Sequence, residues 1–301
     1  MPTATKSRQV RNQLTTLTCC ALLAACVSAP RPQAATHGAQ SAVSVLTLPS
    51  GRSFPVLQWG PIFGKGGKRL GLMVSYLSTA SDKTVLDAEA VELFGFMRVI
   101  AEAATDTGVA VQATFGWTPD APLGTARWTS TFERSPQGEW RHSQPPAALP
   151  ALPRSAWSSP RRDEADEAAA VASAEEWLKD LDRKDFETCW KNAAPAFQNI
   201  IPRQQFSQLM KTARDRTGDN GSRVHVATMM RTNVPLLGSG RYLTVFFGSV
   251  FSTEPHAYES VTLTLDGGSQ RVVGYEVVAP SLVPGAEDPG SGGSPFASLR
   301  H

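Results

Sequence analysis

The chain has 301 residues, of which 41% are hydrophobic and 19% charged, with 29 basic against 27 acidic residues. This composition provides enough apolar material for a folded core. It gives no basic field that would collect nucleic acid, so we expect no nucleic-acid partner.

The start of the chain has the features of a bacterial signal peptide. Three basic residues and no acidic one open it: Lys6, Arg8 and Arg11. An apolar stretch follows from Leu14 to Ala25, shorter than the roughly 20 residues that a membrane-spanning helix needs. Because this stretch ends in Leu23-Ala24-Ala25-Cys26, which resembles a lipobox, we predict cleavage before Cys26 and lipidation of its thiol. The alternative is an ordinary secretory signal followed by a chance cysteine.

Lipid on Cys26 would be the means of attachment to the membrane. Loss of residues 1–25 leaves 26 basic against 27 acidic residues, so a polybasic surface cannot supply the attachment. The residue after Cys26 is Val27 rather than Asp, which in a Gram-negative host favours sorting to the outer membrane, with the protein facing the periplasm.

Four cysteines are present, and three of them lie at or before the predicted cleavage site: Cys19, Cys20 and Cys26. Only Cys189 remains, so we expect no internal disulfide in the mature protein. Cys189 lies beside Trp190 in an apolar helical pattern, which favours a small core residue over a reactive thiol.

Composition divides the remaining chain into two folded blocks. Residues 26–42 form a predicted flexible tether, residues 143–162 a proline-rich linker, and residues 281–301 a disordered tail. Between them lie an N-terminal block, 43–142, and a second block, 163–280.

The N-terminal block predicts a small α+β domain. Apolar runs at 43–48, 54–57, 70–77 and 109–115 are typical of strands, and 128–132 with 139–142 suggests a last hairpin. A helix is expected after Asp82, because apolar residues from Ala88 to Ile100 recur at helical spacing.

The second block predicts three helices followed by a four-stranded antiparallel sheet. Helices are expected after Asp163, after Asp185 and from Arg203 to Arg216, with a connection between Pro195 and Pro202. Strands are expected at 224–230, 242–251, 258–265 and 271–278, where the apolar period changes to two. A curved sheet around a helix, the cone of nuclear-transport-factor-2-like domains, would bury both apolar faces.

Within about 165–280 the residues also resemble a family. The resemblance rests on a set of ordinary positions: Ala174-Glu175-Glu176-Trp177-Leu178, Asp185-Phe186, Cys189-Trp190, Arg223, Tyr242, Val245-Phe246-Phe247, Glu259-Ser260-Val261-Thr262-Leu263 and Val273-Gly274-Tyr275. Together they are similar to the bacterial domain-of-unknown-function 4019 family. Arg271-Val272-Val273 stands where a tryptophan before the final Gly-Tyr is expected. The resemblance implies no known activity.

No catalytic or metal-binding motif stands out, and we predict no cofactor. His225, Tyr258 and Glu259 are the best available candidates for acid/base chemistry in a pocket between sheet and helices. A lone strand histidine is usually solvated or satisfied, and Glu259 could instead pair with Arg223 or Arg241 across the sheet. The histidines at 37, 142, 225, 256 and 301 are too scattered for a metal site.

Two hypotheses on function follow. The favoured one is a non-catalytic, lipid-anchored envelope protein that binds another envelope protein, a small apolar ligand or cell-wall material. The alternative is an enzyme that uses the cone pocket for isomerase, dehydratase or hydrolase chemistry.

Overall fold

A computed structural model describes residues 44–64, 69–80, 82–115, 126–143, 163–234, 237–265 and 270–282. The predicted signal peptide, Cys26, the tether, the proline-rich linker beyond residue 143 and the tail beyond residue 282 lie outside these residues. Among the helices described, none is long and apolar enough to cross a bilayer.

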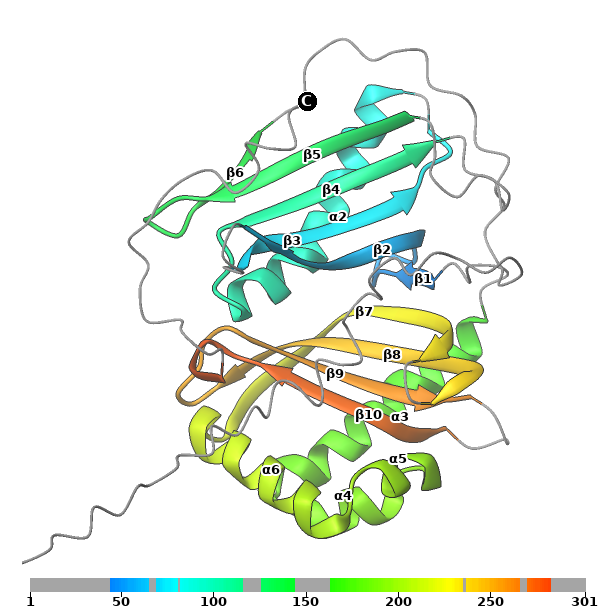
Figure 1. The fold of residues 1–301 in the computed structure, drawn as a ribbon, viewed down its shortest axis with the longest axis vertical. Coiled ribbons are helices and arrows are strands. Elements are labelled where there is room, and N and C mark those ends of the chain that lie inside the picture. Colours follow the sequence, from blue (N-terminus) through cyan, green and yellow to red (C-terminus); the bar gives the residue numbers. More distant parts are fainter. Residues whose placement is uncertain are drawn as a thin grey trace, which may run out of the picture.

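All ten described strands belong to one mixed sheet (Figure 1), in the order β10-β9-β8-β7-β1-β2-β3-β4-β5-β6. The strands of the N-terminal half are β1 (Ser44–Thr47), β2 (Ser53–Phe63), β3 (Arg69–Leu77), β4 (Gly108–Phe115), β5 (Ala126–Arg134) and β6 (Trp140–Ser143). Those of the C-terminal half are β7 (Asn220–Val234), β8 (Gly238–Phe251), β9 (Ala257–Thr264) and β10 (Arg271–Val278). Among the described strands only β3 and β4 pair in parallel, because α2 (Lys83–Ala103) carries the chain back between them.

The predicted fold class is wrong. A separate four-stranded cone was expected after a small α+β domain, but β1 pairs with β2 on one side and with β7 on the other. The β1–β7 register places Val45 opposite Met230 and Leu46 opposite Met229, so the two halves share one sheet. The apolar pattern of a strand shows which of its faces is buried but not which strands pair with it. The β1–β7 pairing therefore could not be predicted from the sequence.

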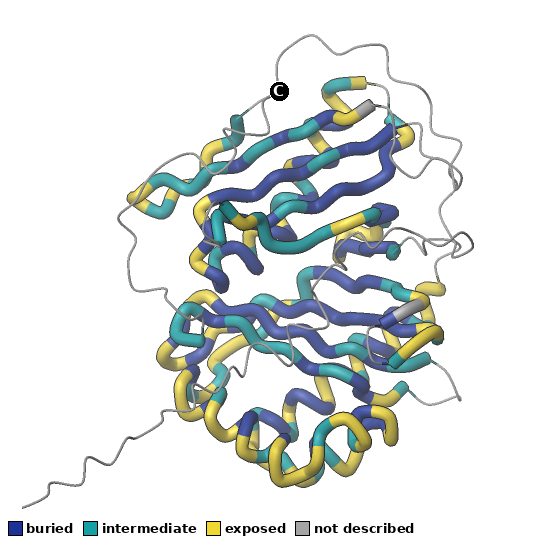
Figure 2. Tube along the Cα trace, viewed as in Figure 1, coloured by how far each residue is buried: buried dark blue, intermediate teal, exposed yellow. Residues whose placement is uncertain are grey.

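Helix α2 lies between the two halves of the sheet. The side chain of Asp82 caps it by accepting hydrogen bonds from the backbone N–H groups of Thr84 and Val85. Its apolar side chains form one core with strands from both halves, including Ala227, Met229, Phe246 and Tyr258 of the C-terminal half. Figure 2 shows β3 and β4 of the N-terminal half, and β9 of the C-terminal half, as largely buried.

A second helical layer covers the other face of β7–β10. It consists of α3 (Glu164–Asp182), α4 (Phe186–Asn192), α5 (Pro195–Ile200) and α6 (Arg203–Thr217), and a 3-10 turn, η4 (Pro280–Leu282), follows β10. Asp163 caps α3, Asp185 caps α4, and Gly218 ends α6 at a φ of 78°. The segment between Pro195 and Pro202 was expected to be a connection without helix, but it contains helix α5. Pro195 is compatible with a helix because it occupies the first turn, where the missing N–H would have no intrahelical partner.

Cys189 is a fully buried free thiol in this second core, as the sequence predicted. The indole N–H of Trp177 donates a hydrogen bond to the backbone carbonyl of Cys189 at 2.9 Å. Burial raises the pKa of the Cys189 thiol to about 12, so the reactive thiolate is suppressed.

Candidate functional site

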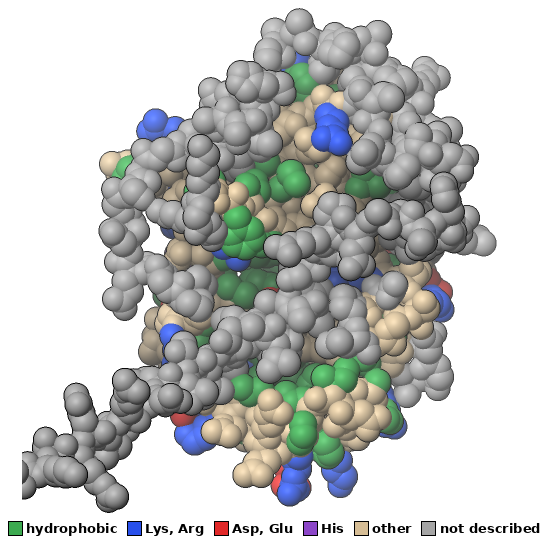
Figure 3. Space-filling model, in the orientation of Figure 1, with side chains coloured by type: hydrophobic (Ala, Val, Ile, Leu, Met, Phe, Trp, Pro, Cys, Tyr) green, Lys and Arg blue, Asp and Glu red, His purple; other side chains and the backbone are tan. Residues whose placement is uncertain are grey.

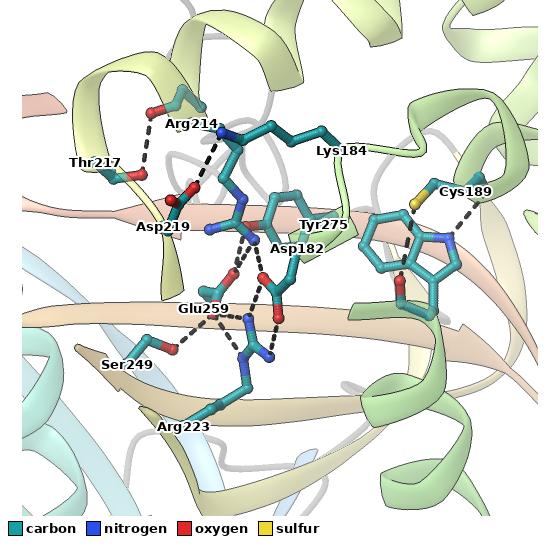
Figure 4. Close-up of polar contacts among 12 residues, drawn as sticks. Asp182, Lys184, Cys189, Arg214, Thr217, Asp219, Arg223, Ser249, Glu259 and Tyr275 are labelled. Atoms are coloured by element: carbon teal, nitrogen blue, oxygen red, sulfur yellow. Dashed lines mark hydrogen bonds and ion pairs between the residues drawn. The ribbon is translucent and has the colours of Figure 1, made fainter. Parts of the chain in front are cut away.

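Glu259 of β9 lies at the centre of a buried ionic network (Figure 4). One carboxylate oxygen, Oε1, accepts hydrogen bonds from Arg214 Nη2 at 3.0 Å and from the Tyr275 hydroxyl at 2.6 Å. The other, Oε2, accepts from Arg223 Nε at 2.8 Å and from Ser249 Oγ at 2.6 Å. Each oxygen therefore has two donors, which fills the usual hydrogen-bonding capacity of a carboxylate.

Asp182 completes the network from the last turn of α3. Its Oδ1 accepts hydrogen bonds from Arg214 and Arg223, both at 3.1 Å, and its Oδ2 accepts from Arg223 Nη1 at 2.9 Å. The two guanidinium groups thus face two carboxylates, and the charges balance. The six side chains come from α3, α6, β7, β8, β9 and β10, so the network ties the helical layer to every strand beneath it.

The electrostatics of Glu259 suit a structural role. Burial alone would raise its pKa, but Arg223 and Arg214 outweigh burial and hold the pKa below its usual range. A general acid or base needs a free lone pair or proton that a substrate can reach. Glu259 is fully buried and both of its carboxylate oxygens are hydrogen-bonded. The arrangement therefore stabilises the fold and does not present a reactive group.

The sequence prediction for Glu259 left two partners open, and the structure decides between them. Arg223 pairs with Glu259, whereas Arg241 pairs with Asp166 of α3 at 2.8 Å. Sequence reasoning missed Arg214 and Asp182, which lie 45 and 77 positions from Glu259 along the chain. The one signal that could have identified them is a charged residue on the apolar face of a helix, at the end of α3 for Asp182 and within α6 for Arg214.

His225 of β7 is the second predicted candidate, and no hydrogen bond joins it to Glu259 among the described residues. Its ring contacts Phe247, with the ring centroids 6.0 Å apart. Burial lowers the pKa of His225, although Glu175 and Glu167 of α3 act in the opposite direction. His225 therefore faces α3 rather than the ionic network.

A concave groove of about 460 Å³ opens beside His225, where the two halves of the sheet meet. We call it the seam groove. Its floor comes from the paired strands β1 and β7, through Thr47, His225 and Thr228, and Leu48 and Pro49 form one rim. Helix α3 forms the long wall through three glutamates, Glu164, Glu167 and Glu175, and three small apolar residues, Ala168, Val171 and Ala172.

A hydrogen bond joins the wall of the seam groove to its floor. The Thr47 hydroxyl donates to Glu167 Oε1 at 3.0 Å and lies 3.1 Å from Ser53 Oγ. The groove could not be found from the sequence, because it exists only where β1 pairs with β7 and α3 packs across that pair.

Among the described residues, no group of three or more His, Cys, Asp or Glu side chains is arranged so that it could hold a metal ion. His256 Nδ1 lies 3.8 Å from Glu102 Oε2, and the other carboxylate oxygen of Glu102 accepts a hydrogen bond from the Trp140 indole. On the face drawn in Figure 3, the visible Lys and Arg side chains of the described residues are scattered rather than gathered in one patch.

Comparison with known proteins gives one match. The family model described as "Protein of unknown function (DUF4019)" matches residues 173–275, which confirms the resemblance over that stretch. All six residues of the ionic network lie inside it, whereas Thr47, Glu164 and Glu167 of the seam groove lie outside. No curated protein and no solved structure matches the chain.

Proposed function

We propose that the protein is a bacterial envelope lipoprotein, tethered through lipid on Cys26 to the outer membrane and facing the periplasm, and that it acts as a non-catalytic binding module. The binding site in this proposal is the seam groove. The observation that carries the proposal is that all hydrogen-bonding positions of Glu259 are taken by structural contacts, whereas a groove of about 460 Å³ lies apart from it where the two halves of the sheet meet. This volume lies within the range of ordinary ligand sites.

Support for lipid anchoring comes from the residues around Cys26. A Cys26→Ala variant is expected to lose incorporation of an alkyne-labelled fatty acid and to leave the outer-membrane fraction. Residues 1–25 stay in place in this variant, so export itself is retained. Unchanged fractionation and labelling of the variant would refute the anchoring part of the proposal.

Support for binding comes from the shape and lining of the seam groove. A photo-crosslinking amino acid at Ala172, an exposed position on the groove wall, is expected to give a discrete adduct in living cells. The same amino acid at exposed Gln208 on α6 serves as the matched control. Identical adduct patterns at the two positions would contradict the assignment of the groove as the binding site.

One observation favours a second candidate function. His225 lies with Glu167 and Glu175 in the seam groove, and burial favours the neutral imidazole that a general base requires. In an enzyme, this histidine would remove a proton from a substrate bound in the groove. His225→Gln should then abolish turnover while leaving ligand binding within about twofold, whereas a pure binding module shows no turnover to lose.

A further inference from the structure

Strand β7 is much longer than the strand that pairs with it on one side. It has 15 residues, and β8 pairs with it from Asn220 to Val234. On its other side β1 pairs only with residues 228–230, at the end of β7 far from α6 (Figure 1). None of the described strands pairs with residues 220–227 on that side, and we call this segment the free edge of β7. Alternate backbone N–H and C=O groups of the free edge therefore point away from the sheet.

The seam groove begins where β1 stops. Strand β1 ends at Thr47, opposite Thr228, and a hydrogen bond from the Gly51 N–H to the Leu48 carbonyl then turns the chain towards β2. The groove is lined by these last residues of β1 and by His225, three positions along the free edge from Thr228. It therefore lies where β1 would run if it continued along β7, and α3 covers one side of it.

Two buried polar atoms of the free edge have no hydrogen-bond partner. They are Nδ2 of Asn220, at the start of the edge, and Nε2 of His225, in the groove. Buried polar atoms are nearly always hydrogen-bonded in folded proteins. Unused hydrogen-bonding capacity thus lies at both ends of the same strand segment, in addition to the outward backbone groups.

Apolar surface borders the free edge on both faces of the sheet. Neighbouring residues of a strand face opposite sides, so Val224 lies on the face opposite His225 and the groove. Val224 is 64% exposed, and Val250 of β8, on the same face, is 43% exposed. The groove wall supplies small apolar side chains on the other face: Ala168, Val171 and Ala172. The free edge contains no Lys or Pro, the residues that often protect an edge strand from further pairing.

We propose that the free edge of β7 binds an extended, apolar peptide segment of a partner protein, which enters the seam groove and adds to the sheet as an antiparallel strand. This inference rests on the proposed binding role of the groove and names the class of partner. A row of outward N–H and C=O groups matches the spacing of another strand, and the bound segment would continue the antiparallel pairing that β1 begins. Its side chains would contact α3 on one face and Val224 on the other, so apolar residues suit both faces.

A short synthetic peptide, acetyl-Lys-Val-Thr-Val-Ala-Val-Lys-amide, is the probe, and its binding to the mature chain carrying Cys26→Ser is measured by fluorescence anisotropy. Two derivatives carry backbone N-methyl groups, one on the odd and one on the even positions. Only one set of alternate amides faces β7, so one derivative should bind at least about tenfold more weakly than the other. Equal affinities of the two derivatives would overturn the proposal.

Matched valine variants test the place of binding. Val224→Lys puts a charge on the free edge and should weaken peptide binding at least about tenfold. Val85→Lys changes an exposed valine of α2 outside the groove and should leave the affinity unchanged. Urea unfolding of both variants confirms that they are folded. Equal peptide affinity of Val224→Lys and the parent protein would overturn the assignment of the edge.

Amide hydrogen exchange followed by NMR reports the pairing itself. The outward N–H groups between Ser222 and His225 should exchange rapidly in the free protein and slow at least about tenfold when the unmethylated peptide is bound. Protection confined to β6 or β10, the outer strands of the sheet, would overturn the proposal. Protection of the β7 amides by a higher protein concentration without peptide would identify a second copy as the occupant and would overturn the choice of partner.

Failure of the strand proposal can be told apart from failure of the binding role. If Ala172 gives its own crosslinked adduct but the peptide protects no amide of β7, the groove binds another class of ligand and only the strand assignment is lost. If the peptide pairs with β7 but no adduct distinguishes Ala172 from Gln208, the cellular binding role is lost.

Discussion

Thr47 of β1 stands directly opposite Thr228 of β7 in the antiparallel register that joins the two halves of the sheet. Both side chains are buried and both line the seam groove. This pair therefore marks the place where a structural junction and a candidate binding site coincide. The groove depends on that junction, since its floor comes from both strands.

Leu46→Ala tests whether the two halves unfold as one unit. Leu46 is fully buried opposite Met229 in the core that both halves share. Removing its side chain is expected to lower the free energy of unfolding by about 2–5 kcal/mol. Urea unfolding followed by tryptophan fluorescence and by circular dichroism should give one coincident transition.

Val85→Ala is the control for this experiment, because Val85 is an exposed residue of α2 and its loss should change the unfolding free energy by less than about 0.5 kcal/mol. Two separate transitions, with only one of them shifted by Leu46→Ala, would show that the halves are independent.

Glu259→Gln tests the ionic network. The substitution keeps the shape of the side chain but leaves two buried guanidinium groups short of a carboxylate. Breaking a buried charge pair from one side is expected to cost about 3 kcal/mol of unfolding free energy, measured by urea denaturation. The exposed Glu176→Gln should be close to neutral. A loss below about 1 kcal/mol in Glu259→Gln would contradict the fastening role.

The same variant predicts a pH dependence with a definite sign. The fold holds the pKa of Glu259 below its usual 4.5, so the ionised carboxylate stabilises the folded state at neutral pH. This contribution is lost as the pH falls below 4.5 and passes through the folded-state pKa. The difference in unfolding free energy between the parent protein and Glu259→Gln should therefore be constant near neutral pH and shrink in acid.

Other carboxyl groups do not affect the comparison between the parent protein and Glu259→Gln. Burial raises the pKa of Asp106 and of Glu276, so these two groups favour the folded state as the pH falls, whereas Glu259 disfavours it. These groups are common to both proteins, so their contributions cancel in the difference. A difference that stays constant down to about pH 3.5 would mean that Glu259 does not titrate as a stabilised carboxylate.

Sequence patterns predicted most elements but not their assembly. The apolar periods located α2, α3, α6 and the strands of both halves, and helices were expected directly after Asp82 and Asp163, which the structure shows to be their N-caps. These signals are local. The β1–β7 pairing joins Thr47 to Thr228 across most of the chain, and a two-residue period carries no information about such a partner. The expectation of a separate cone failed for that reason.

The candidate sites show the same limit. Pairing of Glu259 with Arg223 could be considered in advance, because Glu259 lay on one expected strand, Arg223 immediately preceded another, and the two residues carry opposite charge. Asp182 and Arg214 entered the network only through the packing of α3 and α6 on the sheet. The seam groove needs β1, β7 and α3 together, so none of its residues except His225 stood out beforehand.

Thiol labelling tests the burial of Cys189. In a protein with Cys26 replaced by Ser and residues 1–25 absent, Cys189 is the only thiol. Its raised pKa of about 12 and full burial predict negligible reaction with a disulfide reagent at pH 8 in the folded state. Complete reaction is expected in urea. Rapid stoichiometric labelling without denaturant would show that the helical layer around Trp177 opens readily.

Binding at the seam groove is the central claim, and site-specific photo-crosslinking in living cells tests it most directly. A photo-crosslinking amino acid at Ala172, on the groove wall, is predicted to give a discrete adduct that the same amino acid at exposed Gln208 does not give. Identical adduct patterns at the two positions would contradict the account.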